Sequence, residues 1–380
     1  MGDFRKLLPA IIVGVMGNTV IYLTPLLVGA MVADRGFTDQ QAGLVASADL
    51  AGYAVMTFVT AMFLIHRNWR RMALVGVAIM FIGNIATTFV SAAGAFAAVR
   101  FLSGIGAGML AAIATVSLGQ TDKPDRNYGF LFAASLLFGT AGLWGLPLLL
   151  DRVGLNGAYV FIALLAVLVG FLSTSLPEGR TKQAQTTGSA PPQRSWMLAG
   201  LVLLSITLFW AQQNALYAYM ERIGNASGLS AQFIGFTLGL ANLTGFAGAS
   251  LVAWLGTRFG RLVPLVLSTA VQLACLWALL GTVSSPGYLI AIGVISLAWN
   301  IVNPIQVGIL ADVDQGGRAL ALASTVIGVG LAIGPAMGAA VLHGTDYSRI
   351  LWLAAFLAIL SIVLALPAMR PSRGAVAVAA

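Results

Sequence analysis

The chain has 380 residues, of which 59% are hydrophobic and only 8% are charged, and its formal net charge is +8. Soluble domains carry roughly 25% charged residues, so this composition excludes a soluble fold. The positive balance does not call for nucleic acid, because lysine and arginine in a membrane protein hold loops on the cytoplasmic side. The single cysteine, Cys275, excludes an intrachain disulfide.

Twelve apolar segments are each long enough to cross a hydrocarbon layer of roughly 30 Å as a helix. In chain order they cover residues 7–32, 40–65, 72–92, 96–119, 129–150, 157–176, 196–220, 231–256, 262–283, 287–310, 319–342 and 348–369. Their length and the lack of period-two alternation favour helices over strands. The sequence therefore predicts an all-α membrane protein with twelve transmembrane helices.

The basic residues favour an orientation with both chain termini in the cytoplasm. In that orientation most lysines and arginines lie in cytoplasmic segments. The external loops hold only four arginines, each with an acidic residue within three positions: Arg35, Arg152, Arg222 and Arg349. This asymmetry is the pattern that sets the topology of membrane proteins.

The chain divides near its midpoint into two halves that echo each other. Asp34-Arg35 recurs as Glu221-Arg222, and Arg67 with Arg70 recurs as Arg258 with Arg261. Such repeats in the same order indicate a duplicated unit. We therefore predict two pseudo-symmetric six-helix bundles, 1–176 and 196–380, joined by a polar cytoplasmic linker, 177–195.

Two arginine-rich loops and two glycine-rich spans carry a family resemblance. The loops hold Arg67, Arg70 and Arg71 in the first half and Arg258 and Arg261 in the second; span 4 holds Arg100, Gly104, Gly106 and Gly108; span 11 holds Gly330, Gly334, Pro335 and Gly338. With the twelve-span architecture, these motifs resemble the major facilitator superfamily over essentially the whole chain. His66 and Thr257 stand where the family has a loop acid.

The resemblance implies roles for these motifs. The arginine loops would act as conformational latches, or cap helix C-termini electrostatically. Gly104, Gly108, Gly330, Gly334, Pro335 and Gly338 would serve helix packing and bending. The span 11 pattern is similar to a motif of drug/proton antiporters, and ordinary small-residue packing explains it equally well.

Two ionisable residues lie inside apolar spans, Asp49 in span 2 and Arg100 in span 4. A charge in hydrocarbon costs at least about 2.5–3.5 kcal/mol, so each position needs a reason to exist. Both lie at comparable depth, which permits an ion pair. We predict that Asp49 and Arg100 couple transport to protons; a permanent structural pair and a water-reached Asp49 are the alternatives.

Polar and aromatic side chains on spans 1, 7 and 10 form stripes at helical spacing. The residues are Asn18, Tyr22, Trp210, Gln213, Asn214, Tyr217, Trp299, Asn300 and Asn303. In the superfamily, spans 1, 4, 7 and 10 line the central cavity, so the resemblance implies that these residues bind the substrate. Hydrogen bonds between helices are the alternative use of such amides.

These observations predict a secondary carrier that moves a small amphiphilic molecule by alternating access, with proton-coupled efflux by antiport favoured. Proton-coupled uptake of a small organic anion and a non-transporting receptor or scaffold are the alternatives. We expect no enzyme, cofactor or metal site, because the chain lacks a phosphate loop and its histidines, His66 and His343, lie at span ends. The expected partners are substrate, protons and the lipid bilayer but no nucleic acid, for a monomer in the bacterial inner membrane.

Overall fold

The computed structural model describes residues 2–64, 67–121, 123–176, 193–255, 258–314 and 318–369. The regular secondary structure of these residues is entirely helical, which confirms the all-α prediction. The helices are α1 Gly2–Arg35, α2 Asp39–Val59, α3 Trp69–Thr87, α4 Ala93–Gly119, α5 Pro124–Ser173, α6 Gln193–Ala226, α7 Ala231–Leu255, α8 Leu262–Ala278, α9 Ser285–Val313, α10 Arg318–Ala321, α11 Ala323–Val341 and α12 Ser348–Ala365. A π-helical turn, Thr60–Leu64, extends α2, and a 3-10 turn, Leu366–Met369, extends α12.

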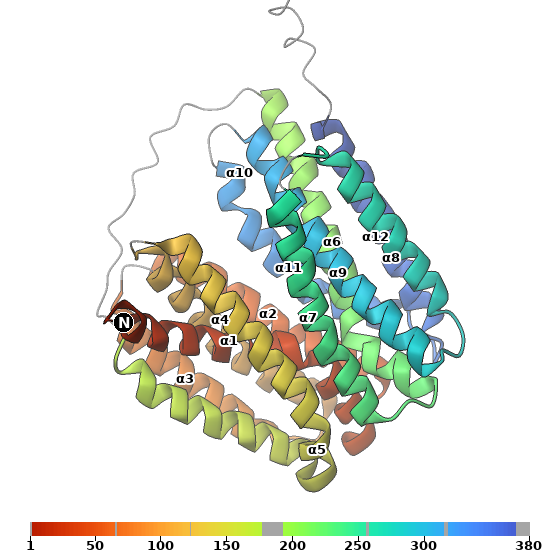
Figure 1. The fold of residues 1–380 in the computed structure, drawn as a ribbon. Coiled ribbons are helices and arrows are strands. Elements are labelled where there is room, and N and C mark those ends of the chain that lie inside the picture. The colour runs from red at the N-terminus through yellow and green to blue at the C-terminus, as the bar shows by residue number, and fades with distance from the viewer. Residues whose placement is uncertain are drawn as a thin grey trace, which may run out of the picture.

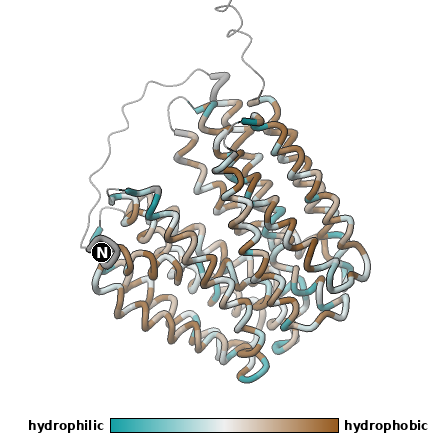
Figure 2. Tube along the Cα trace, viewed as in Figure 1, coloured by the Kyte–Doolittle hydropathy of each residue, from teal (hydrophilic) through white to brown (hydrophobic). Residues whose placement is uncertain are grey.

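Ten helices in this part of the chain are long and apolar enough to cross a membrane, and α8 is apolar but shorter. Hydrophilic residues gather at the helix ends (Figure 2). The protein is thus a multi-pass integral membrane protein. The count of twelve spans and the cytoplasmic termini stay predictions, and twelve requires that α8 crosses and that α5 crosses twice.

Helix α5 contains both predicted spans 129–150 and 157–176. It turns back on itself at Gly154, whose φ of 64° and ψ of −174° are not helical (Figure 1). Only glycine adopts this backbone conformation readily, since a Cβ would clash there. A single residue therefore replaces the loop that the sequence suggested between these spans.

Smaller differences from the predicted spans lie at the ends of other helices. Helix α3 ends at Thr87 and α8 at Ala278, both earlier than predicted. The predicted span 319–342 is broken after α10, because α11 begins only at Ala323. The predicted linker 177–195 lies outside the described residues except for its last three, which begin α6.

Side-chain caps fix where several helices begin. Thr38 accepts a hydrogen bond from the Gln41 amide at 3.1 Å, and the Gln41 side chain accepts one from the Thr38 amide at 3.0 Å. This reciprocal capping box starts α2. Asn68 caps α3 and Ser284 caps α9 through similar bonds to backbone amides.

The helices gather in two groups, α1–α5 and α6–α12 (Figure 1). The groups meet at the end that holds the α1–α2, α6–α7 and α11–α12 connections, and they diverge toward the end that holds the N-terminus. We call their interface the seam. It consists of α2 against α11, α5 against α7, and α1 against α6. The predicted domain boundaries remain a prediction about how the chain divides.

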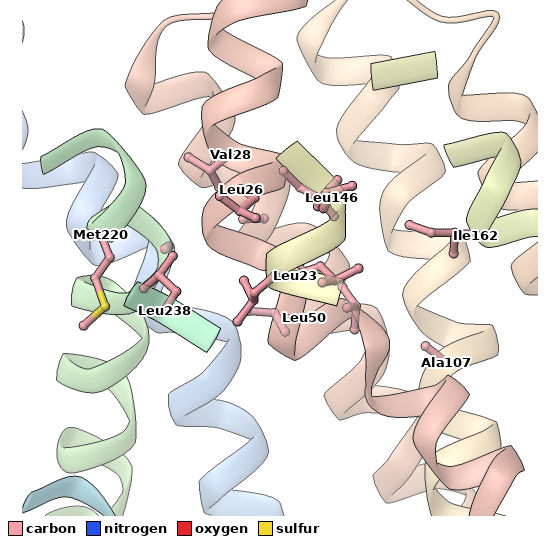
Figure 3. Close-up of a cluster of buried hydrophobic side chains, with 14 of the residues drawn as sticks. Leu23, Leu26, Val28, Leu50, Ala107, Leu146, Ile162, Met220 and Leu238 are labelled. Atoms are coloured by element: carbon pink, nitrogen blue, oxygen red, sulfur yellow. The ribbon is translucent and has the colours of Figure 1, made fainter. Parts of the chain in front are cut away.

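The seam contains both apolar contacts and hydrogen bonds. The largest hydrophobic cluster includes Leu23 and Leu146 of the first group together with Met220 and Leu238 of the second (Figure 3). Gln40 Nε2 donates to Leu342 O at 3.2 Å, Trp144 Nε1 donates to Phe236 O at 3.1 Å, and the Ser47 hydroxyl donates to Ala332 O. The seam is therefore packed like a protein core.

Candidate functional site

Asp49 and Arg100 form a buried ion pair between α2 and α4. Arg100 Nε donates to Asp49 Oδ2 at 2.9 Å, and a terminal guanidinium nitrogen approaches the same oxygen to 2.5 Å. Asp49 is only 5% exposed and Arg100 only 4%. The structure thus brings the two predicted coupling residues together, away from lipid and water.

Two further helices complete the surroundings of the guanidinium. Arg100 NH1 donates to Asn84 Oδ1 of α3 at 2.9 Å. The guanidinium also lies over the ring of Tyr159 in α5, 4.7 Å from its centroid, in cation–π geometry. Asp49, Asn84, Arg100 and Tyr159 form the charge cluster of this protein, with one residue from each of four helices.

Glycines allow the backbones of α2 and α4 to approach closely enough for this pair. A Cβ at Gly104 would collide with the carbonyl oxygen of Asp49, and one at Gly108 with that of Tyr53. From the other side, Gly52 lies equally close to the Phe101 carbonyl. Small residues at four-residue spacing are the usual means of such close contact in membranes.

One oxygen of the pair is unused. Asp49 Oδ1 has no hydrogen-bond partner among the residues that the structure describes. A void of about 10 Å³, at the lower limit for one water molecule, adjoins Asp49, Arg100 and Tyr159. The carboxylate therefore keeps an oxygen that can accept a proton while the other holds the arginine.

Four of the predicted substrate residues line a small cavity of about 40 Å³ between α1, α6, α7 and α9: Tyr22, Gln213, Tyr217 and Trp299. Asn242 lines it as well. The side-chain nitrogens of Gln213 and Asn242 have no hydrogen-bond partner in the described part of the chain. The Tyr217 hydroxyl donates to Tyr22 O at 2.7 Å across the seam. This cavity is narrow, and polar atoms that line it lack hydrogen-bond partners within the described residues. Its volume leaves room for little besides water.

The other predicted substrate residues bond to the protein itself. Asn18 accepts from the Tyr53 hydroxyl at 3.0 Å, and Trp210 Nε1 donates to Asn303 Oδ1 at 3.2 Å. Asn214 and Asn300 each donate at 2.9 Å to a carbonyl one turn back in their own helix. The alternative use of amides, bonding between helices, thus applies to Asn18 and Asn303.

Trp210 and Trp299 form an aromatic pair between α6 and α9. Their ring centroids lie 5.3 Å apart and the planes meet at 82°, an edge-to-face contact. Both side chains are half-buried. Since Trp299 also lines the small cavity, this pair extends the aromatic surface beside it.

The arginine loops do not act alike. Arg70 donates to Leu176 O from two nitrogens, at 3.2 and 3.1 Å, just beyond the end of α5, which is the predicted capping of a helix C-terminus. Arg261 pairs with Asp312 of α9 at 2.7 Å, and Arg258 lies over the Trp254 ring at 6.0 Å.

Arg67 and Arg71 contribute backbone bonds only in the described interactions. The Arg67 amide donates to Leu64 O at 2.9 Å, and the Arg71 amide donates to the Asn68 cap at 3.0 Å. His66 lies outside the described residues. In the second loop, Asp312 supplies an acid that the loop itself lacks.

The glycines of span 11 pack α11 onto α6. A Cβ at Gly330 would lie 2.6 Å from the Trp210 Cβ, and one at Gly334 would lie 2.6 Å from Ala211 O. At Gly338 it would meet the Tyr219 ring at 2.8 Å. Pro335 lies inside α11, close to Gly43 of α2. These contacts are close helix packing, and an antiport role stays a prediction.

A second charged network crosses the seam, and the sequence did not reveal it. Arg222 Nε of α6 donates to Asp39 Oδ1 of α2 at 2.6 Å. The Tyr347 hydroxyl donates to Asp39 Oδ2 at 3.0 Å, and the Tyr219 hydroxyl donates to Asp39 O at 3.2 Å. Burial and the nearby Asp39 carboxylate raise the pKa of Tyr347 to about 12, although Arg222 opposes the shift. Asp39 therefore ties the start of α2 to the second group.

Apolar membrane-length helices in two groups, with a buried ion pair inside one of them, are the architecture of a helical membrane transporter. The sequence profile of the Major Facilitator Superfamily matches residues 7–315, so the chain belongs to that superfamily, as its motifs predicted. By family and fold it is a transporter rather than an enzyme.

Two relatives illustrate the similarity. The chain is 21% identical to the uncharacterized MFS-type transporter YbcL of Bacillus subtilis (strain 168), with 96% of each chain covered. Its fold matches a crystal structure of a bacterial homolog of the human lysosomal transporter Spinster, in an inward-facing and unoccupied conformation. That match has a TM-score of 0.72 at 12% identity and covers 97% of this chain and 96% of the other.

Proposed function

We propose that this protein is a secondary carrier that exports small amphiphilic molecules in exchange for protons. The observation that carries the proposal is the buried Asp49–Arg100 pair, because burying charges at this depth is costly and ionisable residues inside membrane helices usually serve ion pathways. In the proposed cycle, Asp49 alternates between pairing with Arg100 and holding a proton. The proton exchanges with water when the charge cluster opens.

The carrier works by alternating access between two six-helix bundles. With the predicted cytoplasmic termini, the seam is external and the diverging end is cytoplasmic, so the structure corresponds to an inward-facing state. The similarity to a transporter solved in an inward-facing conformation supports this assignment. We propose the bacterial inner membrane as its location and the monomer as its working unit.

The substrate binds between the groups, next to the cavity at the seam. The side-chain nitrogens of Gln213 and Asn242 have no hydrogen-bond partner among the residues described, and Trp210 and Trp299 offer aromatic faces. Such a lining suits a molecule with an apolar body and a few polar atoms. Opening of the seam would enlarge this cavity toward the outside.

Export is favoured over uptake of an organic anion for a specific reason. Arg100 already contacts Asp49, Asn84 and Tyr159, so its guanidinium is not free to bind an anionic substrate. A receptor or scaffold would have no need of an unused carboxylate oxygen at Asp49.

Proteoliposomes with an imposed pH gradient test the proposal. Ethidium serves as the amphiphilic cation and benzoate as the organic anion. We expect ethidium transport that is driven by the gradient in the wild type and uncoupled from it in Asp49→Asn. Gradient-driven benzoate uptake would support the symport alternative. Full proton dependence in Asp49→Asn would refute the role of Asp49.

A further inference from the structure

Glu221 is a buried carboxylic acid that the proposed cycle does not use. It lies in α6 at the seam and is 6% exposed. Its carboxyl group rests against Gly29 of α1, where a Cβ would collide with it. The position is therefore built around this side chain, with a glycine notch on the opposite group.

The carboxyl group lacks a good partner. Glu221 Oε2 has no hydrogen-bond partner among the described residues, and the nearest cation, Arg222, approaches it only to 4.0 Å. Arg222 instead bonds to Asp39 at 2.6 Å. A buried carboxylate that is not hydrogen-bonded or paired is unfavourable, whereas a protonated carboxyl group is neutral and can donate a hydrogen bond.

Other acids surround Glu221. A cavity of about 180 Å³ lies between α1, α5, α6 and α7, and its lining includes Asp34, Asp151, Glu221, Arg222 and Asn225. Asp34 accepts from the Leu155 amide and Asp151 accepts from Gln232 Nε2, both at 2.7 Å. These two acids therefore have partners of their own, unlike Glu221 Oε2 within the described part of the chain.

The remaining neighbouring groups do not neutralise Glu221 either. Asp39 of α2 adds another negative charge beyond Arg222. On α9, the Tyr288 hydroxyl donates to Met220 O at 2.8 Å and so is committed elsewhere. Among the described residues, the cavity lining thus contains three carboxylates and only one guanidinium, that of Arg222. Arg222 already donates to Asp39.

We propose that Glu221 is a second proton-binding site, which holds a proton while the seam is closed and releases it to external water when the seam opens. The proposal rests on the proposed function, since it assumes a carrier whose seam opens. Loss of the proton leaves a charge between the groups, and opening of the seam hydrates it. Low pH therefore favours the closed seam and high pH the open one.

Distances between spin labels across the seam test the proposal in the full-length protein in lipid nanodiscs. The labels occupy Val153→Cys and Thr345→Cys, both exposed at the external end, in a Cys275→Ser background. One linked proton changes the closed-to-open ratio by at most about tenfold per pH unit. We expect a shift toward the long distance between pH 6 and pH 9 that approaches this limit.

The variants give opposite expectations. Glu221→Gln should hold the seam closed and remove the part of the pH response that Glu221 contributes. The matched control Asp151→Asn, an exposed acid that lines the same cavity, should keep the response. The coupling of ethidium transport to the pH gradient in Asp49→Asn reports on Asp49 separately, so a failed role for Asp49 is distinguishable from a failed role for Glu221. An unchanged pH response in Glu221→Gln overturns the proposal.

Two more measurements cover a variant that fails to fold and a metal cation that binds in place of the proton. If Glu221→Gln does not fold, the infrared band of protonated carboxyl groups provides the test at about pH 6, where ordinary carboxyl groups are ionised. This band should change in position or intensity in Glu221→Asp and stay unchanged in Asp151→Asn; a band that is the same in the wild type and in Glu221→Asp would count against the proposal. Sodium chloride at constant pH should not move the label distance. A sodium-dependent shift, with potassium as control, would assign the site to a metal cation instead of a proton.

Discussion

Replacing Arg100 by methionine removes the guanidinium and leaves Asp49 buried without its cation. The two side chains are only 5% and 7% exposed, so water screens their attraction little. Opposite charges about 4 Å apart attract by roughly 4 kcal/mol at an effective dielectric constant of about 20. Breaking a buried pair from one side costs about 3–5 kcal/mol. We expect Arg100→Met to lower the free energy of unfolding by about 3–5 kcal/mol.

The double variant Asp49→Asn/Arg100→Met removes both charges and should recover most of that loss, because an uncharged pair has no desolvation penalty. Reversible unfolding in mixed micelles with sodium dodecyl sulfate, followed by tryptophan fluorescence, measures all four corners of the cycle. A coupling free energy of at least about 2 kcal/mol is expected. Additive single effects, or a loss below about 1 kcal/mol in Arg100→Met, would refute a buried, coupled pair.

Three further predictions concern packing, capping and pH. Gly104→Val should abolish transport and destabilise the fold, since a Cβ there meets the backbone of α2, whereas Gly94→Val, with open space around it, should be tolerated in the same assays. Arg70→Met should cost about 1–2 kcal/mol in unfolding experiments by removing its bonds to the end of α5, and the exposed Arg71→Met less than about 0.5 kcal/mol. Because the folded-state pKa of Tyr347 is raised to about 12, its contribution to stability is complete below pH 10 and is lost as the pH rises toward 12. Unfolding of wild type and Tyr347→Phe across that range should show a smaller loss in Tyr347→Phe, since other tyrosines of the chain also ionise there; equal losses would contradict the prediction.

The sequence predicted the fold class from its long apolar segments, and it singled out Asp49 and Arg100 as two ionisable residues whose depth permits an ion pair. Charges are so sparse in hydrocarbon that two of them at one depth stand out. Their other partners, Asn84 and Tyr159, could not be named, since an amide and a phenol are ordinary within apolar spans. Which side chain meets the guanidinium depends on the rotation of α3 and α5 about their axes, and hydropathy contains no information on rotation.

The turn at Gly154 was missed for a related reason. The predicted spans end at residue 150 and resume at residue 157, with Arg152 in an external loop between them. One residue with positive φ reverses the chain without a loop. Hydropathy is averaged over a window of about 19 residues and does not register a single backbone angle.

The substrate residues were predicted only as a face of each helix. Tyr22, Gln213, Tyr217 and Trp299 line the cavity, while Asn214 and Asn300 bond within their own helices. Close glycine contacts, such as that of Gly334 with α6, constrain the rotation of each helix about its axis and so decide which side chains reach the cavity. The seam network of Asp39 and Arg222 joins residues far apart in the chain, so no local pattern could announce it.

The charge cluster has a mechanical consequence. Its four members come from α2, α3, α4 and α5. The ion pair, the hydrogen bond and the cation–π contact hold these helices together at one depth, so the helices resist sliding past one another. While the interactions of the charge cluster are intact, the first group is therefore expected to move as a single rigid unit. Protonation of Asp49 would then neutralise its carboxylate and weaken the ion pair with Arg100, and the helices of the first group could move relative to one another.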